Sequence, residues 1–334
     1  FYGAYGTGSI NAAGRLPPRV QRVLRALRGL ATVQALSDVL HTKPSDVRTL
    51  MEEMIGRASI AADSPLRRAA ARNLAANVGA MLDQLAAARV PALVCTTAGN
   101  EADLAPLGAD EAAHLSPAQQ AELAALMARG EAACAHDPAE AVAALRAAVQ
   151  LAPQHARAQF LLGRALAAAG DRQGARAALC AARDLDTLPW RPPSQLEDAL
   201  RDVAREKSAI LCDIAGLLRD ESAAAAIDTA FLDDHVHLSL RGQARAARAM
   251  AAAMSSLTGH LHVAAALLET LPDDDTLAQK LGANMYDEYR VHHTLRVLFS
   301  VPFMRRANPA AYAHHDAACR AAEARMSPGV RAAA

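Results

Sequence analysis

The sequence predicts a helix-rich α/β protein, and three observations support this fold class. Alanine-rich stretches such as residues 141–148 favour helix, because alanine has the highest intrinsic helix propensity. Two short apolar runs, at residues 90–97 and 208–213, have the length and composition of buried parallel strands. Helical patterns precede and follow both runs, which is the order typical of a parallel sheet covered by helices.

Composition narrows the classes of function before any motif is considered. The 334 residues include 35 Lys and Arg against 35 Asp and Glu, so the net charge is zero with histidines neutral. Nucleic-acid binders and polybasic membrane-surface proteins need a concentrated excess of charge, and we therefore expect neither kind of protein. Hydrophobic residues make up 52% of the chain, which is enough for a large core and too much for a disordered protein.

Neither the hydropathy nor the cysteine content of the chain identifies its cellular compartment. No apolar run approaches the roughly 18 residues that cross a bilayer, so the sequence predicts no membrane span. The five cysteines are widely spaced among apolar residues, which favours free buried thiols over disulfides or a zinc cluster. They indicate no compartment, and the localisation stays open. The chain begins at Phe1 in a glycine-dense turn without signal-peptide architecture, and we expect it to be part of a longer protein.

The first elements expected along the chain are helices. Apolar residues recur at helical spacing over residues 18–40, with basic residues between them. Ser64 and Pro65 are the residue types of a helix cap and a first helical position, and this helix should run to about Arg89. The apolar run at 90–97 follows directly and leads into Gly99 and Asn100, as a buried strand does where it enters a loop.

The middle of the chain has the pattern of helical hairpins that repeat. Ser116, Asp137 and Asp171 stand where helices should begin, and Gly170 stands where one should end. Three residues recur 34 positions apart, namely Ala141 as Ala175, Leu145 as Leu179, and Ala148 as Ala182. This period and these residue types are those of a tetratricopeptide repeat at the crossing of its two helices. The earlier copy is less regular, because its helix-end glycine, Gly130, is one position out of register.

The densest polar cluster is at residues 231–242 and contains Asp234, His235 and His237. An Asp three residues before a His can place its carboxylate against one imidazole nitrogen and leave the other nitrogen facing a nucleophile. Spacing therefore selects Asp234 and His237 as a candidate catalytic pair and makes His235 a bystander or second candidate. Chance proximity of Asp and His in a polar loop is the competing interpretation.

Asp234-x-x-His237, followed by Leu238 and Gly242, resembles the last block of the SGNH (GDSL-type) hydrolases. Three more stretches resemble a branch of that superfamily in which tetratricopeptide repeats are inserted into the hydrolase domain. They are the opening residues 1–6, the loop at 96–107, and Leu188-Pro189-Trp190-Arg191 after the repeats. Each of these blocks is short. The resemblance rests on the order in which they occur over most of the chain.

The resemblance implies a serine ester hydrolase or O-acyltransferase with a three-layer α/β/α domain. In such enzymes a Ser attacks an ester carbonyl, a His takes its proton, an Asp supports the His, and a Gly and an Asn help to hold the oxyanion. Only Asp234 and His237 map onto this chain, because the other three residues belong upstream of the block that Phe1 begins. Ser9 is a poor substitute for the nucleophile, since no strand precedes it. The chain by itself is therefore expected to be inactive.

The expected organisation has four parts. Residues 1–115 form part of a hydrolase domain, residues 116–187 form the inserted repeats, residues 188–258 return to the hydrolase domain, and residues 259–334 form a C-terminal helical extension. The implied substrate is an ester-bearing small molecule or an acylated glycan. A protein partner is possible through the repeats, and no cofactor is expected.

Further polar residues lie at positions typical of a binding site. Asn100, Glu101 and Asp103 follow a predicted strand, and ligands of α/β proteins bind at the carboxyl ends of strands. Asn100 and Glu101 are therefore candidates for substrate binding, with loop capping as the alternative. His235 is a third candidate for substrate binding. Arg191 could meet an anion or anchor the exit from the repeats, and we favour anchoring.

Paired histidines invite a metal interpretation at 260 and 262, at 292 and 293, and at 314 and 315. None of them pairs with carboxylates or thiols at ligand spacing on one helix face, so we expect no metal site. Residues 273–275 are an acidic run that we interpret as a solvated helix start, since no EF-hand spacing follows it.

A different hypothesis is a non-catalytic interaction protein. The repeats would bind a peptide, and the α/β part would be a scaffold or an enzyme that has lost its activity. The repeats are too few to fold alone, because stacked repeats need about three units. We therefore expect them to pack on the rest of the chain under either hypothesis.

Overall fold

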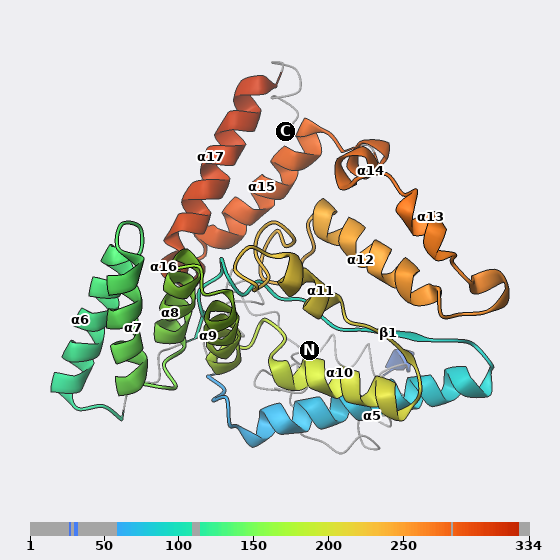
Figure 1. Cartoon of the computed structure of the whole chain (residues 1–334), viewed down its shortest axis with the longest axis horizontal. Helices are drawn as coiled ribbons and strands as arrows, with labels where there is room; N and C mark the ends of the chain where they lie inside the picture. Colours follow the sequence, from blue (N-terminus) through green and yellow to red (C-terminus); the bar gives the residue numbers. More distant parts are fainter. Residues whose placement is uncertain (1–26, 28–29, 33–58, 109–113, 282, 327–334) are drawn as a thin grey trace.

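The computed structural model describes residues 27, 30–32, 59–108, 114–281 and 283–326. The opening block at 1–6, Ser9, and all but four residues of the pattern at 18–40 lie outside these residues. Helices dominate the described part, as predicted, and Figure 1 shows their arrangement. The elements in chain order are α5 (Pro65–Ala87), β1 (Leu93–Cys95), α6 (Pro117–Ala133), α7 (Pro138–Leu151), α8 (Ala156–Ala168), α9 (Arg172–Leu185), α10 (Ser194–Glu206), β2 (Ile210–Cys212), α11 (Ile214–Glu221), α12 (Leu240–Met254), η2 (Gly259–Leu261), α13 (Ala265–Glu269), α14 (Asp274–Lys280), α15 (Met285–Ser300), α16 (Pro302–Ala307) and α17 (Pro309–Arg325).

Both predicted strands are present, and they form a parallel pair. Leu93 is opposite Ile210 and Cys95 is opposite Cys212. Helices α5 and α10 share a core with Val94 on one face, whereas α11 and α12 share a core with the two cysteines on the other face. The described residues thus contain a two-stranded sheet between helices. A three-layer α/β/α domain of the SGNH type is not shown by this small sheet and stays a prediction.

Helices α6 to α9 form the predicted repeat hairpins. The capping box at Ser116 is present, with the Gln119 amide donating to the Ser116 hydroxyl over 3.3 Å. Asp137 and Asp171 cap α7 and α9 through their carboxylates. Gly170 has a φ of +82°, a left-handed conformation that glycine adopts without steric cost, and it separates α8 from α9.

The glycine that is out of register in the sequence has the same packing role as its partner. A Cβ added to Gly163 would overlap the side chain of Leu179, and a Cβ added to Gly130 would overlap that of Leu145. Each glycine therefore lets the two helices of its hairpin approach closely. Gly130 lies inside α6 rather than at its end, and the shift of one residue still lets α6 and α7 pack closely.

The repeats pack on the rest of the chain, as expected for so few units. Their core residues Phe160 and Leu166 belong to the same buried cluster as Ala102, which follows β1, and Ala226, which follows α11. The C-terminal helices attach to the same region, because Trp190 and Leu104 pack with Phe299 of α15. The segment that follows β1 therefore contacts the repeats, the loop after α11 and the C-terminal helices.

Two smaller predictions concern membrane spans and cysteines. Within the described ranges, no helix combines the length and the apolar content needed to cross a bilayer. All five cysteines are free thiols. Cys212 and Cys319 are buried, while the other three are only partly buried.

Candidate functional site

The predicted Asp and His lie in a tight loop between α11 and α12. Leu232 and Leu238 form an antiparallel bridge across this loop, and the Asp233 amide donates to the His237 carbonyl over 2.8 Å. Ser239 then caps α12. A Cβ on Gly242 would overlap the carbonyl oxygen of Phe231, so the loop can fold back on α12 only with glycine at this position.

Asp234 and His237 form a close pair. The Oδ2 atom of Asp234 lies 2.7 Å from Nδ1 of His237, and Oδ1 accepts the backbone amides of Val236 and His237 at 2.8 Å each. The carboxylate is nearly buried, whereas the His237 side chain is 74% exposed. A hydrogen bond from Nδ1–H to the carboxylate leaves Nε2 unprotonated, which is the tautomer of a general base.

The surroundings of Asp234 favour its ionised form. Burial by itself would raise the pKa of Asp234, but the neighbouring imidazole of His235 and the two backbone amides hold that pKa well below its usual range. The Nδ1 atom of His235 lies 3.5 Å from the same Oδ2 atom. The His235 ring packs beside Trp190, with ring centroids 5.4 Å apart. His235 is thus a partly buried neighbour of the pair rather than its exposed member.

Asn100 lies directly beside this loop. Its backbone amide donates to the His235 carbonyl over 3.0 Å, and its side-chain oxygen accepts the Asp103 amide at 3.0 Å. The Asp103 carboxylate in turn accepts the amide and the hydroxyl of Thr229. The side chains of Asn100 and Asp103 therefore act as loop caps, which was the alternative to substrate binding. Their contacts position the post-strand loop against the Asp234–His237 loop.

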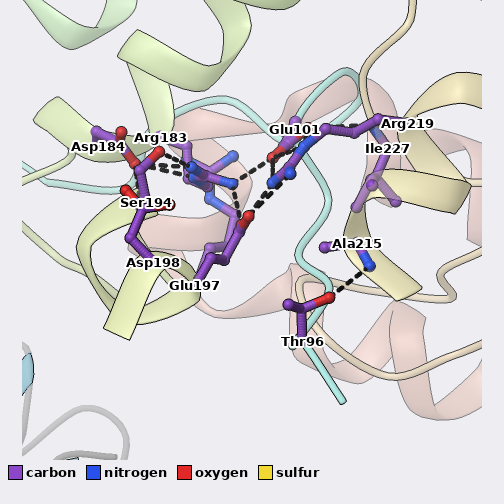
Figure 2. A network of polar contacts seen from close by, with 12 residues as sticks. Thr96, Glu101, Arg183, Asp184, Ser194, Glu197, Asp198, Ala215, Arg219 and Ile227 are labelled. Carbon is purple, nitrogen blue, oxygen red and sulfur yellow. Dashed lines mark hydrogen bonds and ion pairs between the residues drawn. The ribbon is translucent and has the colours of Figure 1, made fainter. Parts of the chain in front are cut away.

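Glu101 lies in a separate, buried ion network, which Figure 2 shows. Its carboxylate pairs with Arg183 of α9 and lies 2.7 Å from Nη2 of Arg219 on α11. Glu197 of α10 contacts both arginines, at 2.8 Å from Arg183. Two carboxylates thus face two guanidinium groups, and we call these four residues the buried ion network. It joins the post-strand loop, the repeats, α10 and α11.

The charges in this network balance within the core. Burial by itself would raise the pKa of Glu101, but Arg183 and Arg219 lower that pKa below its usual value. The Glu101 side chain has no exposed surface. The structure therefore places Glu101 among structural contacts and brings it to no exposed surface, and a role in substrate binding gains no support from this position.

Arg191 has the contacts of an anchor. Its guanidinium donates to the carbonyls of Asn100 and Leu104 and lies 3.0 Å from the Asp186 carboxylate. Asp186 also accepts the backbone amides of Leu107 and Gly108. These contacts tie the exit from the repeats to the post-strand loop, as the favoured interpretation expected.

Three members of the buried ion network, namely Arg183, Glu197 and Arg219, were not predicted as site residues from the sequence. The signal was present for Arg183, which occupies the apolar face of α9 next to Ala182 and one turn beyond Leu179. It was also present for Arg219, which stands one turn beyond Ala215 and next to Leu218 on the apolar side of α11. A charge at a position where the helical pattern demands an apolar residue predicts a buried partner of opposite charge.

Two predicted features remain, the acidic run at residues 273–275 and the nucleophile that His237 would serve. Asp273 caps α14 by accepting the Thr276 amide, which agrees with a helix start. In the part of the chain that the structure describes, no serine hydroxyl is hydrogen-bonded to His237. The predicted nucleophile and oxyanion residues, and Ser9, are outside this part.

Comparison with known proteins bears on the repeats alone. A family model described as tetratricopeptide repeat matches residues 134–187, which span α7, α8 and α9. No curated protein and no solved structure matches the chain. The tetratricopeptide part of the resemblance is therefore confirmed, and the hydrolase part stays a prediction.

Proposed function

We propose that this chain is a protein-interaction module that binds a helical segment of a partner along α6. The observation that carries this proposal is the tetratricopeptide match at residues 134–187, which covers α7 to α9. Helix α6 precedes the matched residues and packs on α7 as the first helix of that hairpin. Stacked helical repeats of this kind expose extended surfaces that are used for binding other proteins.

The free surface of the repeats is at their outer end. The opposite end is covered, because Ala178 and Leu179 of α9 belong to one buried cluster with Ala102 and Ala226. Helix α6 lies at the edge of the array in Figure 1 and buries only Leu123, Gly130 and Ala133. Most of α6 is therefore available to a partner.

The exposed side of α6 has an unusual composition for the end of a repeat array. Its alanines alternate at spacings of three and four residues along one side, and they are Ala118, Ala121, Ala125, Ala128 and Ala132. Terminal repeats normally present a polar outer face that keeps the array soluble. A row of small apolar residues instead allows the backbone of another helix to approach closely. Charged residues flank this row, including Glu122 and Arg129.

Site-specific photo-crosslinking tests this proposal in cells that produce the complete protein. A photoreactive residue at Ala125 should give a discrete adduct with one protein, identified by mass spectrometry. The same residue at Ala247, an exposed alanine of α12, serves as the control and should give no such adduct. Ala125→Arg should abolish co-purification of that protein. Equal or diffuse cross-linking at both positions would reject binding along α6.

A second function is favoured by the geometry of Asp234 and His237. We propose that this pair serves a serine ester hydrolase or O-acyltransferase acting on an ester-bearing small molecule or an acylated glycan. The 2.7 Å contact and the exposed ring of His237 support this proposal. The Nε2 atom of His237 would take the proton of a serine hydroxyl, and Asp234 would stabilise the resulting imidazolium. The serine would come from residues outside the described part.

The hydrolase proposal is tested on the complete protein, including any residues that precede Phe1. A short acyl ester should be hydrolysed, and His237→Ala should lower kcat/KM by roughly 10²–10⁴-fold, the usual contribution of a general base. The control is His136→Ala, which removes an exposed histidine near the end of α6 and should leave the rate unchanged. Equal activity of the parent and His237→Ala would reject this function.

A further inference from the structure

Three histidines of the C-terminal helices meet at one point. His292 lies on α15, and His314 and His315 lie on α17, which packs against α15. One ring nitrogen from each histidine lies within 4.8 Å of the other two. The Nδ1 atoms of His292 and His315 are 3.0 Å apart.

We propose that His292, His314 and His315 bind one transition-metal ion, with Zn²⁺ as the best candidate. Imidazole nitrogens are preferred ligands of zinc, and three histidines leave a fourth tetrahedral position for water or another ligand. Zinc binds nitrogen at about 2.0–2.1 Å, so ligand nitrogens around one ion lie about 3.3 Å from each other. The nitrogens here approach that spacing, and small side-chain rotations would complete it.

The alternative explanation is a hydrogen bond between two histidines that pack in the core. Such a bond accounts for the 3.0 Å contact between His292 and His315. It does not account for the third ring, because His314 is exposed and its ring centroid lies 5.1 Å from that of His315 and 5.9 Å from that of His292. A convergence of three imidazoles at one point is the arrangement of a ligand set.

The neighbours of the cluster suit a metal site. Phe299 stacks on the His315 ring with centroids 5.4 Å apart, which fixes the orientation of the most buried ligand.

Sequence spacing could not reveal this set. His314 and His315 are adjacent on one helix, and His292 is on another helix, 23 residues from His315. A search for ligands on one helix face therefore rejects all three. Their convergence depends on how α15 and α17 pack.

Zinc binding by the full chain tests the proposal, with any polyhistidine tag removed. Equilibrium dialysis against Zn²⁺ should saturate at about one ion per chain, as expected for a single three-histidine site. His314→Ala removes an exposed ligand without disturbing the core and should weaken Zn²⁺ binding at least about tenfold. His292→Gln should have a similar effect. Circular dichroism checks that both variants are folded.

The matched control is His293→Ala, since His293 is adjacent to His292 on α15 but packs on Tyr289 instead of the cluster. This variant should bind Zn²⁺ like the parent chain. Co²⁺ in place of zinc should give visible absorption bands of a four-coordinate ion, and His314→Ala should change them. The absence of saturable Zn²⁺ binding, or equal affinity in the parent, His314→Ala and His292→Gln, would overturn the proposal.

Discussion

The chain contains two acid–base arrangements with similar contact distances and opposite exposure. In the buried ion network, Glu101 and Arg183 have no exposed side-chain surface, and every oxygen of Glu101 has a partner. In the Asp234–His237 pair, the carboxylate is buried but the His237 ring is 74% exposed. The first arrangement can only hold elements together, whereas the second leaves a functional atom free for chemistry. Contact distance alone therefore does not separate a buried structural pair from an exposed candidate catalytic pair.

The largest expected effect comes from breaking the buried ion network. Glu101→Gln removes one of two carboxylates that face Arg183 and Arg219. It leaves a buried charge uncompensated, which costs about 3–5 kcal/mol of the free energy of unfolding. Urea denaturation followed by circular dichroism measures this loss.

The matched control for this prediction is Asp198→Ala, which removes a 65% exposed carboxylate that pairs with Arg201. An exposed pair of this kind contributes less than about 1 kcal/mol. Equal losses in both variants would mean that the burial of Glu101 has no energetic consequence, and the comparison between the two arrangements would fail.

An intermediate effect is expected in the acid dependence of stability. The pKa of Glu101 is lowered by folding, so its ionisation stabilises the folded chain above the unfolded pKa near 4.5. This contribution falls as the pH drops below that value towards the folded pKa. The parent chain should therefore lose stability between about pH 5 and pH 3, and Glu101→Gln should show a shallower slope in that window. Urea denaturation at stepped pH values measures both slopes.

The Asp234–His237 pair provides a second test of the acid dependence of stability. The pKa of Asp234 is also lowered, and burial opposes this shift while His235 and backbone amides produce it. His237→Ala removes the imidazole that lies 2.7 Å from the Asp234 carboxylate but keeps His235 and both backbone amides. The acid slope of this variant should therefore be only slightly shallower than that of the parent. A slope as shallow as that of Glu101→Gln would show that the His237 ring, and not the retained groups, keeps the pKa of Asp234 low.

Much of the local structure could be predicted from the sequence. The strands at 90–97 and 208–213, the caps at Ser64, Ser116 and Asp137, and the repeat hairpins depend on neighbouring residues, and all are present. The contact of Asp234 with His237 was also accessible, because three residues separate the two. Local spacing carries the information in each of these cases.

Features that depend on distant packing could not be predicted in this way. Glu101 and Arg183 are 82 residues apart, and their contact requires the repeats to dock beside β1. The position of Glu101 after a strand suggested an open site, but the loop directs its carboxylate into the core. The three-histidine cluster likewise needs two helices to pack. The fold of the repeats was therefore predictable, and so was the burial of single charges on apolar helix faces, while the identity of their distant partners was not.

The smallest expected effect concerns the Asp234–His237 pair, which is the exposed arrangement of the two. His237→Ala removes a ring that contacts Asp234 but is mostly surrounded by solvent. Asp234 keeps its hydrogen bonds from the amides of Val236 and residue 237, so the loop retains its main contacts. The free energy of unfolding should therefore change by less than about 1 kcal/mol. Urea denaturation under the conditions used for Glu101→Gln measures this difference. A loss as large as that of Glu101→Gln would show that the His237 ring is needed to hold the loop, and the pair would then be structural like the buried ion network.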